Sequence, residues 1–241
     1  MSIPLKSLSV AALVLAPALP ASAAEQFAPP TGCEGYLTVQ LKSCQVANYY
    51  RCQQDNPGDQ WTTYFDSEGP FYTSMIDAET RWVRSFDHFD GSWEFLDEES
   101  PDHASFSALL DTGRDDYDFS TTTDYGETRH FKGFDELTGG TVKIDGVTLE
   151  RTTFQMTASN AEGEFLHSRE GNQLISREWR VFFADTEHFE NAFGDKVDSV
   201  DTPVEFVFPG DKGFFSTKPQ YGCDMMMTGG ATAVVPAGYR D

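Results

Sequence analysis

Basic residues are scarce in this chain, whose 241 residues include 17 Lys and Arg against 39 Asp and Glu, for a formal net charge of −22. Such a charge repels the phosphates of nucleic acids and anionic lipid headgroups, so we expect no nucleic-acid partner. The acids are spread along the sequence, which is typical of a solvated acidic surface. A basic protein partner would also suit this charge, and an acidic structural or interaction module is therefore one alternative function.

The sequence also lacks an apolar run long enough to cross a membrane as a helix, which takes about 20 residues. Its clearest apolar run, Val10–Leu19, follows Lys6 and precedes the small residues Ala21-Ser22-Ala23-Ala24. This order predicts a cleavable signal peptide over residues 1–24 and a periplasmic or secreted protein. Cys33 follows Pro30-Thr31-Gly32 rather than a lipobox, so we expect no lipid anchor.

Catalytic motifs are missing as well. The chain has no Gly-x-Ser-x-Gly elbow, and its five histidines show none of the tight spacing of a His-Glu-x-x-His site, so we expect no metal or other cofactor. Asp87-His88, and Asp185 with His188, each follow a predicted strand that carries a Trp and a Phe. If those strands pair, the four side chains would converge within about 6 Å, as a carboxylate- or metal-dependent hydrolase requires. That secreted enzyme is the second functional hypothesis, and its catalytic residues stay unassigned.

All four cysteines, Cys33, Cys44, Cys52 and Cys223, lie after the predicted cleavage site. An even number in an oxidising compartment predicts two structural disulfides. The segment between Cys44 and Cys52 is predicted to be a strand, which would hold their Cα atoms roughly 26 Å apart, whereas a disulfide needs about 7 Å or less. We therefore expect one of these two to pair with Cys223 and the other with Cys33.

The remaining sequence favours β structure. Short segments of alternating polarity are separated by turn residues at regular spacing, which predicts an antiparallel meander. The dipeptide Asp145-Gly146 suits a tight hairpin between Thr141–Ile144 and Val147–Thr157. Because successive long strands curl, the expected fold class is mostly β: a single-domain antiparallel meander that forms a strongly curved sheet or a barrel, with few short helices. The β-rich domain is expected over residues 36–241, after an extended segment at residues 25–35.

Several local expectations are specific. A strand is predicted at Ser105–Leu110, a turn at Glu170-Gly171-Asn172 and a strand at Gln173–Ala184, followed by a short helix at Thr186–Phe193. Neither face of Val147–Thr157 is apolar along its full length, so we do not expect the protein to span a membrane.

The aromatic residues carry the leading functional hypothesis. Trp82 with Phe86, and Trp179 with Phe183, each place a Trp four residues before a Phe, on one face of a predicted strand. These four are the candidate ligand-binding residues. The expected function is a non-catalytic periplasmic binding or envelope-associated protein whose aromatics hold a hydrophobic or amphipathic small molecule inside the curved sheet. The sequence leaves the oligomeric state open.

Overall fold

A computed structural model describes residues 26–226, and it shows one antiparallel sheet of 13 strands. The predicted mostly-β fold class is therefore confirmed, whereas the predicted signal peptide lies outside the described residues. No helix in the described part of the chain combines the length and apolarity that crossing a membrane requires. The strands are β1 (Cys33–Leu41), β2 (Gln45–Cys52), β3 (Gln60–Phe65), β4 (Pro70–Ile76), β5 (Trp82–Asp87), β6 (Trp93–Leu96), β7 (Arg114–Thr123), β8 (Thr128–Ile144), β9 (Val147–Asn160), β10 (Phe165–Ser176), β11 (Val181–Asn191), β12 (Lys196–Val200) and β13 (Pro203–Val207).

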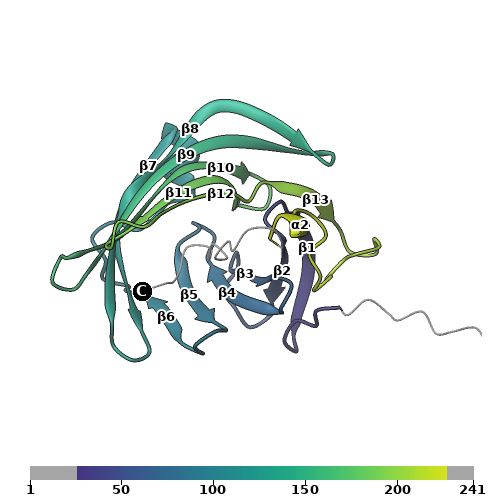
Figure 1. The fold of residues 1–241 in the computed structure, drawn as a ribbon, viewed down its shortest axis with the longest axis horizontal. Helices are drawn as coiled ribbons and strands as arrows, with labels where there is room; N and C mark the ends of the chain where they lie inside the picture. Colours follow the sequence, from purple (N-terminus) through teal and green to yellow (C-terminus); the bar gives the residue numbers. More distant parts are fainter. Residues whose placement is uncertain (1–25, 227–241) are drawn as a thin grey trace, which may run out of the picture.

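The sheet is a meander from β1 to β12, with β13 added beside β1. β12 and β13 thus occupy opposite ends of the strand order, although only Asp201 and Thr202 separate them in the chain. The Asp201 amide donates to the Asp185 carbonyl of β11 (2.8 Å), and the Lys42 amide next to β1 donates to the Thr202 carbonyl (3.1 Å). The two ends therefore meet at this corner without pairing, and the sheet is open but strongly curved. In Figure 1 strands β7–β12 arch over strands β2–β6.

Two glycines allow the long strands to approach closely where they bend. A Cβ at Gly133 of β8 would overlap the backbone carbonyl of Gln155, and a Cβ at Gly171 of β10 would overlap that of Thr186. Glycine inside a strand commonly marks such a bend or close backbone approach. The predicted turn around Gly171 is therefore wrong, because β10 continues through this residue.

The hairpin prediction at Asp145-Gly146 is confirmed, with both residues at positive φ between β8 and β9. The strand predicted at Ser105–Leu110 is instead the helix α1 (Phe106–Thr112). The Ser105 hydroxyl accepts from the Ala108 amide (3.2 Å), which caps the helix, and Gly113 ends it in the left-handed conformation. α1 thereby buries Phe106 and Leu109 against the sheet.

The second half of the sheet differs from the prediction in two further places. Gln173–Ala184 is split between β10 and β11 by a turn in which Arg180 has a positive φ of 52°. The helix predicted at Thr186–Phe193 is wrong, because most of this segment pairs with β10 and β12 as part of β11. Strand pairing on both sides outweighs the local helix signals.

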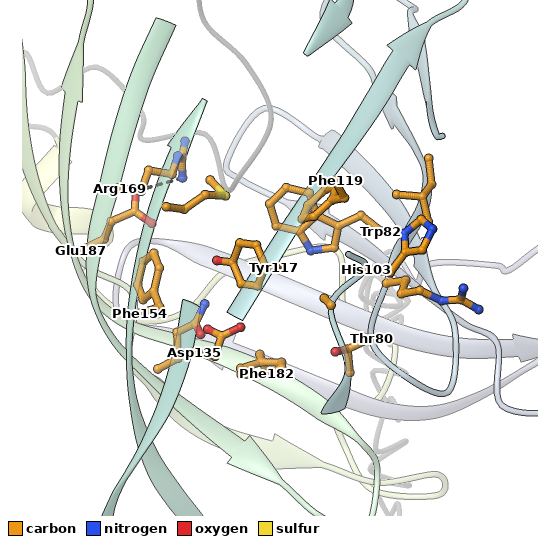
Figure 2. A pocket seen from close by; sticks show the side chains of 15 residues that line it. Thr80, Trp82, His103, Tyr117, Phe119, Asp135, Phe154, Arg169, Phe182 and Glu187 are labelled. Atoms are coloured by element: carbon orange, nitrogen blue, oxygen red, sulfur yellow. Dashed lines mark hydrogen bonds and ion pairs between the residues drawn. The ribbon is translucent and has the colours of Figure 1, made fainter. Parts of the chain in front are cut away.

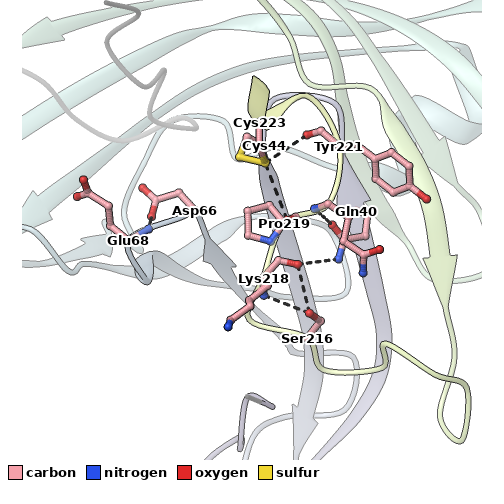
Figure 3. Close-up of a disulfide and its surroundings, with 10 residues drawn as sticks. Gln40, Cys44, Asp66, Glu68, Ser216, Lys218, Pro219, Tyr221 and Cys223 are labelled. Atoms are coloured by element: carbon pink, nitrogen blue, oxygen red, sulfur yellow. Dashed lines mark hydrogen bonds between the residues drawn. A yellow bond between two sulfur atoms is a disulfide. The ribbon is translucent and has the colours of Figure 1, made fainter. Parts of the chain in front are cut away.

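Two disulfides are present, as expected from the cysteine count. Cys33 pairs with Cys52 at the open end of the β1–β2 hairpin. Cys44 pairs with Cys223, the first residue of α2 (Cys223–Met226), so the C-terminal segment is tied to the β1–β2 turn (Figure 3). Gln40 supports this segment, because its side chain donates to the Lys218 carbonyl (3.2 Å).

The main apolar core fills one end of the space between the two halves of the sheet. Leu37, Val39 and Tyr49 of β1 and β2 pack there against strands β9–β11 and β13. A second apolar cluster lies on β7–β9 around Phe119, Phe131 and Met156, and Trp82 packs against it from β5. Unfilled space remains between these two clusters, and it forms the candidate site.

Candidate functional site

The concave interior of the sheet contains a cavity with two lobes. One lobe has a volume of about 100 Å³ and the other about 200 Å³. The lobes adjoin each other, because they share six lining residues, Thr80, Trp82, Arg169, Gln173, Phe182 and Glu187. Engineered apolar cavities of about 150 Å³ bind benzene. The larger lobe exceeds this volume and the smaller lobe is below it, so a small organic molecule would use the space of both lobes.

The smaller lobe is walled by aromatic side chains from both halves of the sheet (Figure 2). Trp82 of β5 makes edge-to-face contacts with Phe119 of β7 (5.4 Å between ring centroids) and with Phe131 of β8 (5.5 Å). Phe154 of β9 and Phe182 of β11 complete the apolar wall. These interlocked rings provide a rigid apolar surface for a ligand.

A polar network around Glu79 lies next to this lobe, whose lining includes the following residues Thr80 and Arg81. The Glu79 carboxylate accepts from the Ser107 amide of α1 (2.8 Å) and from the Arg180 guanidinium of the β10–β11 turn (2.8 Å). The Ser105 hydroxyl also donates to Glu79 (3.1 Å). The segment that carries Thr80, which lines both lobes, is therefore fixed to the helix and to the turn.

Arg169 of β10 and Glu187 of β11 form an ion pair (2.9 Å) at the junction of the lobes. Their side chains are only 5% and 19% exposed, so water screens this pair weakly. Burial raises the pKa of Glu187, and the Arg169 guanidinium opposes that rise. The Arg169 guanidinium also lies over the Phe189 ring (5.2 Å).

Asp135 of β8 is a second ionisable group in the smaller lobe. It lies directly opposite Asp115 of β7, so both side chains are on one face of the sheet. Burial is the main cause that raises the pKa of Asp135 to about 7, and the Asp115 carboxyl adds to this rise. Burial also raises the pKa of Asp115 to about 6, although the Ser105 amide donates to this carboxyl (2.7 Å).

The larger lobe is more polar. Tyr64 of β3 and Tyr72 of β4 face it together with Ser74 and Ser85. Burial raises the pKa of both tyrosines, so their hydroxyl groups stay neutral at physiological pH. The cavity therefore has an apolar end and a hydroxyl-rich end, with charged groups between them.

The four predicted ligand residues are divided among three places. Trp82 lines both lobes of the cavity. Phe86 lines a separate, more open groove of about 530 Å³, together with Trp61, Trp93 and Phe27, which precedes β1. Trp179 and Phe183 pack in the main core, where Phe183 is 2% exposed. The structure thus brings only Trp82 of this set to the interior cavity.

The residues of the predicted hydrolase site have separate local partners. His88 lies within hydrogen-bond distance of Thr73 (2.9 Å), and His188 of Asp198 (2.7 Å). Asp185 accepts from the Thr202 hydroxyl (2.7 Å). Among the described residues, no group of three or more His, Cys, Asp or Glu side chains is arranged to hold a metal ion.

Sequence reasoning did not identify Asp135, Arg169 or Gln173 as site residues. One signal existed for Asp135: it is four residues after Phe131, so it continues the buried face of β8. A charged residue in phase with buried apolar residues of a strand marks an interior polar site.

No protein-family model matches the chain, and no curated protein or solved structure shows significant similarity to it. No relative therefore suggests an activity for the cavity. Its function has to be inferred from the geometry and chemistry described above.

Proposed function

We propose that this protein is a non-catalytic, exported binding protein that holds a small amphipathic molecule in the cavity between Trp82 and Arg169. The observation that carries the proposal is an aromatic lobe directly beside a hydroxyl-rich lobe in the interior of the curved sheet. Ligand sites in proteins are typically concave, largely apolar and equipped with a few fixed polar groups.

An exported location supports this proposal. Two disulfides are consistent with an oxidising compartment, where such bonds persist. The signal peptide predicted over residues 1–24 indicates the same compartment. A periplasmic or secreted carrier is the form of the proposal that fits both observations.

Catalysis by paired carboxylates is less well supported by the geometry. Of the two facing acids, Asp135 lines the cavity and Asp115 does not. Asp115 is 7% exposed and accepts a hydrogen bond from the Ser105 amide, so its role is to hold the start of α1. A two-carboxylate mechanism needs both groups at the substrate.

Filling the aromatic lobe should abolish binding. Ala104 lines this lobe, so in the A104F variant the added ring should occupy the ligand's space. We expect the affinity for 2-naphthol, measured by isothermal titration calorimetry, to fall by at least about tenfold. Because the ring enters unfilled space, we expect the variant to stay folded, which thermal unfolding will verify.

Ala161→Phe is the matched control, because Ala161 is exposed in the β9–β10 turn. The control should leave the affinity for 2-naphthol unchanged. If the A104F variant folds and binds 2-naphthol as the wild type does, the lobe is not the binding site.

A further inference from the structure

The Asp135 carboxyl lies inside the aromatic lobe without a protein partner. In Figure 2 it is placed among Tyr117, Phe154 and Phe182. No hydrogen bond or ion pair joins its side chain to any residue within 26–226, although Asp115 faces it across the β7–β8 ladder. Asp135 is partly buried, and a carboxyl among aromatic rings is costly to ionise unless something in the lobe pairs with it.

Two further polar atoms that face the lobe are hydrogen-bond acceptors. The Gln173 Oε1 atom is buried and has no hydrogen-bond partner. The His103 Nδ1 atom is also buried without a partner, and Nε2 of the same ring donates to the Glu98 carbonyl (3.2 Å). In the neutral ring Nδ1 therefore carries a lone pair. With the Asp135 carboxylate, the residues that line the lobe carry three acceptor groups without a protein partner.

The cationic side chains of the lobe already have acidic partners. Arg169 is paired with Glu187 (2.9 Å), and Arg81 donates to Asp77 (2.6 Å). An anionic ligand would have to compete with these carboxylates. A cationic ligand could instead pair with the Asp135 carboxylate. It could also contact several aromatic faces, which attract cations.

We propose that the ligand of the cavity is a small primary or secondary amine, whose ammonium group pairs with Asp135 while its apolar body packs against Trp82 and Phe154. An ammonium group offers only hydrogen-bond donors, which complements the three acceptors of the lobe. This inference rests on the proposed binding function and adds the chemical class of the ligand. Asp135 is then the specificity-determining residue.

The test compares matched compounds that differ only in their polar group. 2-Phenylethylamine, 2-phenylethanol and 3-phenylpropionate, and the corresponding indole series, are titrated into the wild type, D135N and the surface control D111N by calorimetry. Asp111 is exposed on α1, so D111N removes the same charge outside the cavity. We expect the amine to bind at least about tenfold more tightly than the alcohol or the acid in the wild type and in D111N. In D135N the amine should lose this advantage, while the alcohol binds as before.

The outcomes separate the two proposals. If amine, alcohol and acid bind with similar affinity, the amine assignment is wrong and the binding function stands. If no member of either series binds, or if binding is unaffected when the lobe is filled in A104F, the binding function fails as well. If the alcohol or acid is preferred and D135N weakens it, Asp135 acts as a protonated donor and the amine assignment is again overturned.

The pH dependence provides a second readout. Aliphatic amines stay protonated between about pH 5.5 and pH 8.5, so an ammonium–carboxylate pair should strengthen at least about tenfold across this range as Asp135 ionises. D135N should bind the amine with little pH dependence. A protonated Asp135 donor would give the opposite trend, with weaker binding at high pH. The ionisable groups on the elements packed around Asp135 are Glu79, Arg81, Asp102, His103, Asp115, Tyr117, Arg169, Arg180 and Glu187.

Discussion

Replacing Arg169 with methionine is expected to lower the free energy of unfolding by about 3–5 kcal/mol. The change leaves the Glu187 carboxylate inside the protein without its guanidinium partner, and burial already raises the pKa of this group. For a domain of this size the melting temperature should fall by roughly 10 °C. Chemical denaturation at pH 7 measures the effect on the free energy.

Lys132→Met is the matched control for Arg169→Met. It breaks the Lys132–Asp118 ion pair, whose side chains are 78% and 42% exposed. Solvent-exposed pairs contribute about 0–1 kcal/mol, so the control should change stability little. Adding E187Q to Arg169→Met removes the unpaired charge and should recover part of the loss. Equal effects of Arg169→Met and Lys132→Met would show that the pair at the lobe junction is not effectively buried.

The meander was predictable because its turns are encoded locally. Asp145-Gly146 favours a hairpin through its own backbone preferences. The length of one strand excluded a Cys44–Cys52 disulfide but left open which of these two cysteines pairs with Cys223. The secondary-structure predictions were wrong where contacts between segments distant in the sequence determine the local structure. Gly171 resembles a turn residue in the sequence, but its missing side chain allows β11 to approach β10.

The candidate site was less predictable than the fold. Trp82 was identified because aromatic residues on strands favour interior surfaces, but the same pattern also described Trp179, which packs in the core. Whether Asp135 lies at an interior cavity depends on which other strands face it across the curved sheet. That arrangement comes from the meeting of the two sheet ends at Asp201 and Thr202, which no local pattern encodes.

Asp135→Asn is expected to change how stability depends on pH. The folded protein holds the proton of Asp135 up to about pH 7, whereas an unfolded chain releases it near pH 4. The folded state therefore binds more protons in this window, and the contribution of Asp135 to stability decreases as pH rises from about 4 to 7. Without the carboxyl, this loss, on the order of 2–4 kcal/mol, should disappear.

The experiment compares urea unfolding of the wild type, D135N and D111N between pH 4.5 and pH 8. D135N should gain stability relative to the wild type as pH rises, and the gain should level off above about pH 7. The free energy of unfolding of D111N should depend on pH as that of the wild type does, because Asp111 is exposed. A constant difference between D135N and the wild type at every pH would mean that Asp135 ionises normally and is not enclosed.

A retained unfavourable carboxyl agrees with a role in binding. Groups with strongly shifted pKa values that face a cavity are typical of functional sites. If D135N is more stable than the wild type at neutral pH, as expected above, this result will agree with the proposed role of Asp135 in binding. The outer groove beside Trp61 and Trp93 is larger and more open, and its two ionisable groups already have partners. Asp55 accepts from the Trp61 indole (2.7 Å), and His88 lies within hydrogen-bond distance of Thr73 (2.9 Å).

The location of a bound ligand tests the central claim most directly. Intermolecular nuclear Overhauser effects between 2-naphthol and the labelled protein will identify the contacting side chains. We predict contacts to Trp82, Phe119 and Phe154 inside the sheet. Contacts confined to Phe86, Trp61 and Trp93 in the outer groove, or no specific contacts at all, would contradict the account.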